Sequence, residues 1–181
     1  AFLVNQRSPL AKLRTPNTEG KDTRASDIIH YTAKKYNINP KYLLVTLEKE
    51  QSLVTKKTLE QRRLDWATGY AVCDDCSKDD AGIQKYKGFA NQIDGAAGIM
   101  RWYYDNIKTT PWIKRAHQTY TIDKTTVTPQ THATAFLYNY TPHIQGNQNF
   151  WRIWQKWFGQ VYPDGTLIRR KNNATVYIVK D

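Results

Sequence analysis

The apolar residues of this chain recur with the spacing of an α-helix in several separate segments, and this periodicity constrains the fold more than any other feature. After Ser26, which suits an N-cap, apolar side chains return at helical intervals. Asn39 followed by Pro40 indicates a second start, because asparagine caps a first turn and proline fits its first position. We therefore predict a mainly α fold with helices near residues 26–36, 40–53, 91–107, 131–140 and 149–158.

The tail differs in pattern from the rest of the chain. Residues 165–168 and 175–179 are rich in β-branched and apolar side chains, and a polar turn at 171–173 separates them. This pattern predicts a β-hairpin. We divide the chain into an N-terminal arm (1–25), a helical catalytic domain (26–160) and a C-terminal hairpin (161–181). The hairpin either packs on the helices or begins a further domain.

Three stretches lack a helical pattern. Residues 1–24 are expected to form an extended arm, and the Thr-rich residues 108–130 a loop with a turn of helix within 112–116. Residues 56–90 are polar and glycine-containing. Long irregular stretches inside compact domains tend to be functional, so we look for part of the site in residues 56–90.

Composition excludes two classes of protein. Aromatic residues make up 13% of the 181 residues, which excludes a disordered chain. No apolar run is as long as a membrane span. Twenty-seven Lys and Arg against sixteen Asp and Glu give a net charge of +11, so we expect an anionic partner, or a flat one on which rings stack.

The two cysteines, Cys73 and Cys76, are separated by two aspartates. Two thiols do not complete a zinc site, and the acidic side chains between them oppose a reactive thiolate. We expect a local disulfide in an exported protein. The aspartates of residues 74–80 lack EF-hand spacing, so we expect neither a metal nor a cofactor.

Glu50 is the most informative residue of the predicted second helix. At about 100° per residue it falls in one stripe with Leu43, Leu47 and Val54, whereas Glu48 lies toward the polar side. Apolar surroundings favour the protonated form of a carboxyl group, which a general acid requires. The alternative is that Glu50 pairs with a nearby arginine or lysine and has no chemical role.

Four segments resemble motifs of lytic transglycosylases and related lysozyme-like muramidases, in the order of that family and over residues 26–158. Glu50-Gln51-Ser52 resembles the Glu-Ser motif, although a glutamine separates the two residues. Residues 64–70 occupy the place of the Gly-Leu-Met-Gln loop, which is largely replaced. Residues 91–97 are similar to the Asn-Ile-x-x-Gly helix start, and residues 136–142 resemble the Ala-Ala-Tyr-Asn-Ala-Gly-Pro segment.

The resemblance implies a lysozyme-like, two-lobed helical domain with a substrate groove for peptidoglycan glycan strands. Glu50 would protonate the glycosidic oxygen, and water or the muramyl 6-hydroxyl would capture the oxocarbenium-like species. Asp65 is the candidate second carboxylate, with a loop-stabilising Asx turn as the alternative. The expected substrate-binding residues, from this resemblance and from their place beside the groove, are Gln51, Ser52, Trp66, Thr68, Gly69, Tyr70, Tyr138, Asn139, Tyr140 and His143.

We thus expect a secreted or cell-envelope monomer that cleaves the MurNAc-GlcNAc backbone and takes no nucleic acid as its partner. Two alternatives remain open at this stage. One is an endo-N-acetylglucosaminidase or chitinase-like activity on the same fold. The other is a catalytically silent module that binds the cell wall or nucleic acid through its basic, aromatic surface.

Overall fold

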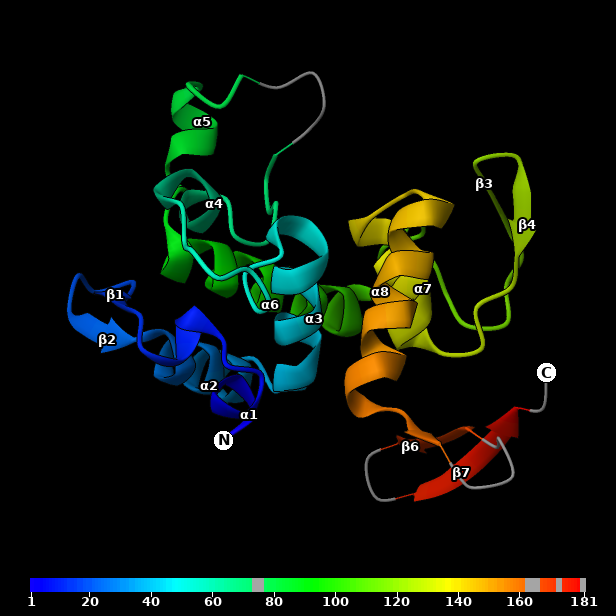
Figure 1. Cartoon of the computed structure of the whole chain (residues 1–181). Helices are drawn as coiled ribbons and strands as arrows, with labels where there is room; N and C mark the ends of the chain where they lie inside the picture. The colour runs from blue at the N-terminus through cyan, green and yellow to red at the C-terminus, as the bar shows by residue number, and fades with distance from the viewer. Residues whose placement is uncertain (73–76, 162–166, 172–173, 180–181) are drawn as a thin grey trace.

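The computed structural model describes residues 1–72, 77–161, 167–171 and 174–179, and it is mainly helical, as predicted (Figure 1). Five long helices match the predicted ones in place, although several ends differ. They are α2 (Ala25–Lys35), α3 (Pro40–Gln51), α6 (Phe89–Asn106), α7 (His132–Tyr140) and α8 (Ile144–Phe158).

Local hydrogen bonds set the predicted helix starts. Asn39 caps α3 by accepting from the Lys41 amide at 3.0 Å, with Pro40 in the first position, as predicted. Thr131 caps α7 by accepting from the Thr134 amide at 3.1 Å. The cap of α2 is Arg24 rather than Ser26, so that prediction is wrong by two positions.

Helix α8 begins at Ile144, five residues before the predicted start. The Ile144 amide donates to Asp123 at 2.8 Å, and the Asn147 side chain donates to Thr141 O at 2.6 Å. These tertiary and loop bonds stabilise a first turn that Gly146 disfavours by propensity. A pattern of apolar residues does not reveal them.

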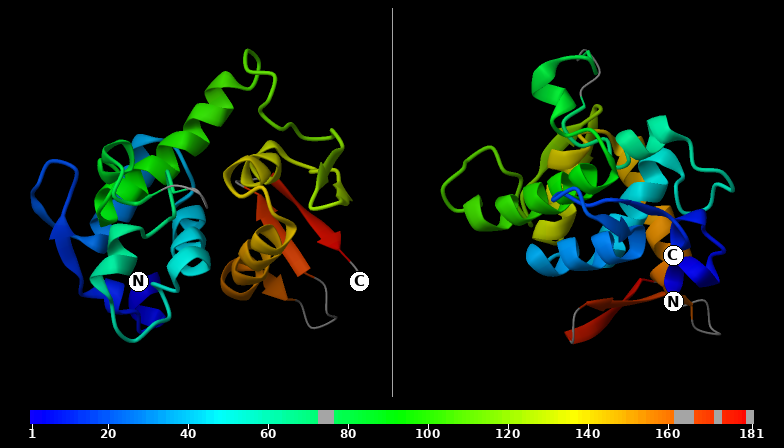
Figure 2. Two further views of the ribbon diagram at one scale, coloured as in Figure 1. Left: turned by 90° about the horizontal axis from the view of Figure 1, so that it is seen from above. Right: turned by 90° about the vertical axis from the view of Figure 1, so that its left-hand side faces the viewer.

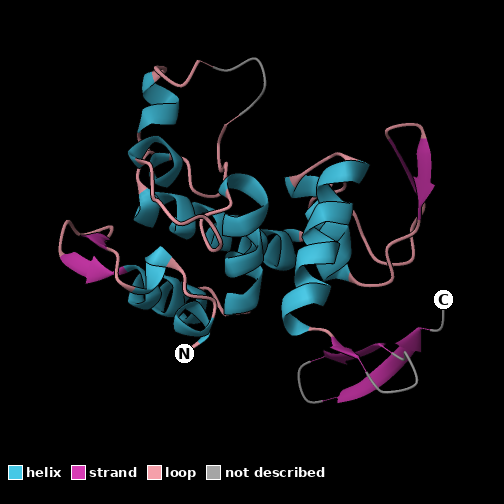
Figure 3. Ribbon diagram, viewed as in Figure 1, coloured by secondary structure: helices cyan, strands magenta, loops and turns pink. Residues whose placement is uncertain are grey.

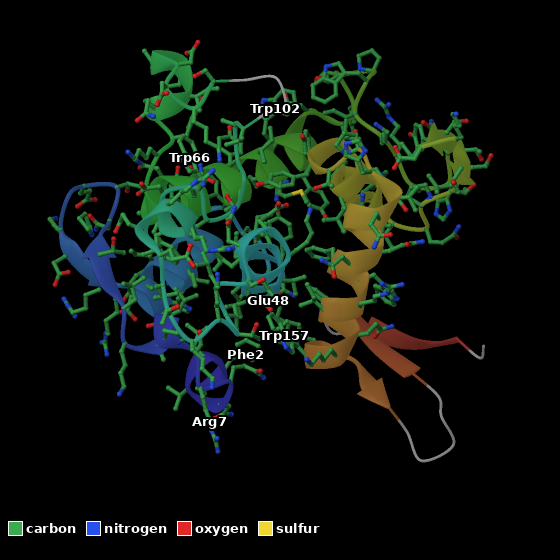
Figure 4. All side chains as sticks on the ribbon, turned by 45° about the horizontal axis from the view of Figure 1, so that its top comes forward. Phe2, Arg7, Glu48, Trp66, Trp102 and Trp157 are labelled. Carbon is green, nitrogen blue, oxygen red and sulfur yellow. The ribbon has the colours of Figure 1, made fainter. Side chains whose placement is uncertain are left out.

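The N-terminal arm is folded rather than extended. It contains α1 (Phe2–Asn5), a 3-10 helix η1 (Pro9–Ala11) and the antiparallel strands β1 (Arg14–Pro16) and β2 (Asp22–Arg24). The Phe2 ring lies against Trp157, with ring centroids 5.4 Å apart (Figure 4), and Leu10 is fully buried. Apolar contacts with the rest of the chain therefore order this segment.

The stretches predicted to be irregular also contain short elements. Residues 56–90 include α4 (Gln61–Asp65) and α5 (Ala81–Gln84). Residues 108–130 contain the hairpin of β3 (Tyr120–Ile122) and β4 (Thr125–Val127), and residues 112–116 are irregular, with turns at either end, instead of the expected helical turn. Strands of three residues are too short to show a recognisable alternation of polar and apolar side chains, so the sequence did not predict β3 and β4.

The helices form two groups on either side of α3, as the views in Figures 1 and 2 show. Helices α1, α2, α4 and α5 lie on one side, and α7 and α8 on the other. Helix α3 packs against α2, α6 and α8, and α6 also contacts α4 and α7. The core between them includes the fully buried Leu43, Leu47, Ile93 and Phe136.

Close packing against a glycine of α6, predicted for Gly95 and Gly98, occurs at Gly95. A Cβ at Gly95 would overlap the ring of Tyr70, whereas one at Gly98 would lie 3.4 Å from the Tyr36 ring, an ordinary contact distance. The short strands lie at the periphery of the helical body (Figure 3). At the C-terminal end, β5 (Gln160–Val161), β6 (Leu167–Lys171) and β7 (Ala174–Val179) form an antiparallel sheet that includes the predicted hairpin.

Candidate functional site

The Glu50 carboxylate lies where three segments distant in sequence meet. Glu50 is in the last turn of α3. A Cβ at Gly69, in the loop after α4, would lie 3.4 Å from Glu50 Oε2. The third segment is the end of α7, reached through Lys49. The Glu50 side chain is 26% exposed.

Lys49 pairs directly with Glu50. Its ammonium lies 2.7 Å from Glu50 Oε1 and donates to the Thr141 hydroxyl, just past α7, at 2.6 Å. The Lys49 side chain is only 8% exposed. The apolar neighbours Leu43, Leu47 and Val54 are buried as predicted, yet the carboxyl group is paired with a cation rather than isolated among them. Of the two readings of Glu50, pairing with a nearby lysine is therefore the one observed, and the partner is Lys49.

Gln92 of α6 holds the loop beside Glu50. Its fully buried side-chain oxygen accepts from the Tyr70 amide at 3.0 Å, and its side-chain nitrogen donates to the carbonyls of Tyr70 and Tyr86 at 3.0 and 2.9 Å. The Thr68 hydroxyl donates to Gln92 O at 2.8 Å. Between them, Gly69 has φ +68°, a conformation that glycine adopts without strain.

Tyr140 connects α7 to the same loop. Its hydroxyl donates to Thr68 O at 2.9 Å, across 72 positions of sequence. Burial raises the pKa of Tyr140 well above its usual value, with the neighbouring Tyr42 contributing, so the hydroxyl keeps its proton and remains a donor. Thr68, Gly69 and Tyr140, all predicted from the sequence, are thus brought to the surroundings of Glu50.

Glu48 has a structural role. Its carboxylate accepts from the amides of Val54 and Thr55, both at 3.1 Å, and from the Thr55 hydroxyl at 2.6 Å. These bonds fix the turn after α3, where Ser52 adopts φ +56° as the C-cap. The two residues at this end of the helix, Gln51 and Ser52, were predicted to bind substrate. The Gln51 carbonyl accepts from the Arg63 guanidinium, so both residues here shape the end of the helix.

Asp65 and Trp66 follow each other at the end of α4. The Asp65 carboxylate accepts from the Gln61 side chain at 2.8 Å and lies 3.7 Å from the Lys87 ammonium. The Asp65 carboxylate is therefore engaged by these two side chains rather than in an Asx turn. Trp66 is 5% exposed, with Lys78 over its ring, so it presents no open face to a sugar.

The remaining predicted residues lie on α7 or just beyond it, or over α6. Tyr70 contacts Tyr86 edge to face, with ring centroids 5.1 Å apart. Asn139 accepts from the backbone and side chain of Lys114, both at 3.3 Å. His143 pairs with Asp123 at 3.2 Å on the β3–β4 hairpin. Tyr138 is half-buried, and burial raises its pKa.

Sequence reasoning allowed for a lysine beside Glu50 without identifying Lys49, and it missed Gln92. Gln92 precedes the apolar Ile93 and lies one turn before Ala96, so it is a polar residue next to the buried face of a helix. That position is a usable signal for a buried hydrogen-bonding residue. Lys49 offered no such signal, because its predicted position is on the polar side of α3.

Three further predictions concern membranes, metals and cysteines. No helix among the described residues is long and apolar enough to cross a membrane. Within the same residues no group of three His, Cys, Asp or Glu side chains is placed to hold a metal ion. Cys73 and Cys76, with their predicted disulfide, lie outside the described residues.

A family model described as "LasA, N-terminal domain" matches residues 1–170. Comparison with curated proteins and with solved structures finds no match. The family match overturns the resemblance to lytic transglycosylases and lysozyme-like muramidases. That resemblance depended on four short segments with incomplete residue matches, whereas the family model covers nearly the whole chain.

Proposed function

The chain belongs to the family of LasA N-terminal domains, and from the surroundings of Glu50 we propose that it is a glycosidase that cleaves the glycan strands of peptidoglycan. The observation that supports this function is a partly exposed carboxyl group held where three segments meet. A general acid needs both a fixed position and access to the leaving oxygen. Glu50 has a fixed position through Lys49, and its 26% exposure gives access.

In the proposed reaction Glu50 donates a proton to the glycosidic oxygen, and an oxocarbenium-like transition state follows. Lys49 has a second acceptor in the Thr141 hydroxyl at 2.6 Å. The ammonium therefore keeps a hydrogen bond when Glu50 takes up the proton that it will donate.

The proposal includes a two-lobed arrangement with a substrate groove. The helices on either side of α3 would form the lobes, and Glu50 would face the groove between them. The 68–70 loop and the end of α7, joined by Tyr140 and Thr68, would form its walls. The net charge of +11 would draw the protein to a cell wall whose peptides and attached polymers carry negative charge, outside the cell or in its envelope.

The identity of the attacking group depends on the second carboxylate. Asp65 is engaged by Gln61 and Lys87, so capture by water would require Asp65 to exchange these partners. Capture by the muramyl 6-hydroxyl needs no such exchange and would leave an anhydromuramyl end. Mass spectrometry of released fragments distinguishes the two products, and a GlcNAc reducing end would identify an endo-N-acetylglucosaminidase instead.

Glu50→Gln tests the proposal. We expect release of soluble fragments from purified sacculi to fall about 100-fold or more, because the N–H of an amide is far too weak an acid to protonate the glycosidic oxygen. Glu19→Gln is the matched control, since Glu19 is an exposed carboxylate in an ion pair on the N-terminal arm. Circular dichroism establishes that both variants fold. Equal rates of release for wild type and folded Glu50→Gln would refute the assignment, and sacculi that bind without any release would identify a silent binding module.

A further inference from the structure

The two oxygens of the Glu50 carboxyl group meet two different segments of the chain. Oε1 lies 2.7 Å from the Lys49 ammonium, which is the only polar partner of this carboxyl group within the described part of the chain. Oε2 faces Gly69, since a Cβ at that position would lie 3.4 Å from this oxygen. The place of the carboxyl group is therefore set by Lys49 on one side and by Gly69 on the other.

Thr141, the C-cap of α7, holds Lys49 in place. Its hydroxyl accepts from the Lys49 ammonium at 2.6 Å, and the Lys49 side chain is only 8% exposed. The first turn of α8 fixes Thr141 in turn. The buried side chain of Asn147 donates to Thr141 O at 2.6 Å, and a Cβ at Gly146 would overlap the Thr141 methyl group. Thr141 is thus braced by two helices, α7 and α8.

Tyr140, the residue before Thr141, holds the other side. Its hydroxyl donates at 2.9 Å to the carbonyl of Thr68, the residue directly before Gly69. This loop follows α4, which lies on the opposite side of α3 from α7 and α8 (Figure 1). Two consecutive residues at the end of α7 therefore reach the two segments that contact the two oxygens of Glu50.

We propose that Tyr140 and Thr141 form a clamp that positions the Glu50 carboxyl group. Thr141 acts through Lys49 at Oε1, and Tyr140 acts through residues 68–69 at Oε2. Both are positioning residues, so Tyr140 supports the site from behind instead of binding substrate as the sequence predicted. A general acid must stay aligned with the leaving oxygen, and small displacements slow such reactions strongly. The kinetic consequence rests on the proposed function, whereas the clamp itself can be measured without substrate.

Two hydroxyl deletions test the kinetic role. Thr141→Val keeps the branched shape in an extended backbone, and Tyr140→Phe keeps the ring. For each we expect kcat on solubilised glycan strands to fall about 10- to 100-fold, the scale on which a misplacement of about 1 Å acts. KM should stay nearly unchanged, because neither hydroxyl would contact the substrate. Thr141→Ser should restore most of the rate. Thr18→Val is the matched control, since Thr18 is exposed in the turn between β1 and β2.

NMR tests the clamp without any reaction. Thr141→Val should make the Lys49 ammonium more mobile, measured by nitrogen relaxation, and should leave the Gly69 amide as it is. Tyr140→Phe should do the reverse. It should accelerate hydrogen exchange of the Gly69 amide, which donates to Trp66 O at 3.1 Å, and leave Lys49 as it is. A general loss of stability would instead loosen both groups in both variants. Circular dichroism establishes that each variant folds.

The outcomes separate the clamp from the proposed function. A raised KM with unchanged kcat would place the two hydroxyls on the substrate and overturn the clamp. Unchanged kcat in both folded variants would overturn it too, as would an equal loss in Thr18→Val. If the wild type releases no fragments at all, the proposed function fails and NMR alone decides. Unchanged Lys49 mobility and Gly69 exchange would then show that the clamp does not hold the carboxyl group.

Discussion

Gln92 decides the position of the loop beside Glu50, although it has no contact with a reacting group. The side-chain amide of Gln92 accepts from the Tyr70 amide and donates to the backbone carbonyls of Tyr70 and Tyr86. The backbone carbonyl of Gln92 accepts from the Thr68 hydroxyl. A buried amide of this kind has an effect larger than that of one hydrogen bond, because its removal leaves several partners unsatisfied.

Replacing Gln92 by Leu should lower the free energy of unfolding by about 3 kcal/mol, since each buried group left without a partner costs about 1–3 kcal/mol. The urea unfolding midpoint measures the effect. The exposed Gln130, which donates to Thr128 O, provides the control Gln130→Leu, with an expected change within about 0.5 kcal/mol. A Gln92→Leu midpoint equal to that of the control would show that the network is not needed for stability.

At the scale of elements, the β3–β4 hairpin acts as an external cap for α8. Asp123, in the turn of the hairpin, accepts from the Ile144 amide at 2.8 Å and pairs with His143. A carboxylate at this end also interacts favourably with the helix dipole. The hydrogen bond from Ile144 and then that from His143 hold the pKa of Asp123 below its ordinary value.

Because the folded pKa of Asp123 is lowered, the cap is complete above the unfolded value of 3.8 and is lost as pH falls below it through the folded pKa. We expect the protection of the Ile144 and hairpin amides, that is their NMR exchange rates relative to the intrinsic rates at each pH, to fall over this acidic range. In Asp123→Asn the protection should be low already and should not depend further on acid. The variant Asp79→Asn, altered in a loop near α5, should retain the wild-type profile. An identical acid response in Asp123→Asn would contradict the external cap.

At the scale of the whole molecule, the charge of +11 should govern the first encounter with the wall. Binding of the Glu50→Gln variant to sacculi is expected to weaken by severalfold between 50 mM and 500 mM salt, because ions screen exposed charges over about 10 Å or less. Sedimentation at both salt concentrations measures this. Affinity that does not change with salt would indicate that rings and hydrogen bonds, rather than net charge, carry the binding.

The sequence by itself determined the five long helices and two of their starts, at Asn39 and Thr131. Both depend on hydrogen bonds between residues a few positions apart, and apolar periodicity marks which face is buried. Local spacing also indicated that the glycines of α6 permit close packing, as Gly95 does under Tyr70.

Only the tertiary structure decided what surrounds Glu50. Lys49 reaches Thr141 across 92 positions and Tyr140 reaches Thr68 across 72, and pairing at such separations follows from how whole helices pack. The same packing buries Trp66 while leaving Trp112 exposed, a difference that residue type does not encode. Short-range hydrogen bonds can be predicted from neighbouring residues, whereas the partner of a side chain depends on which distant segments the folded core brings together.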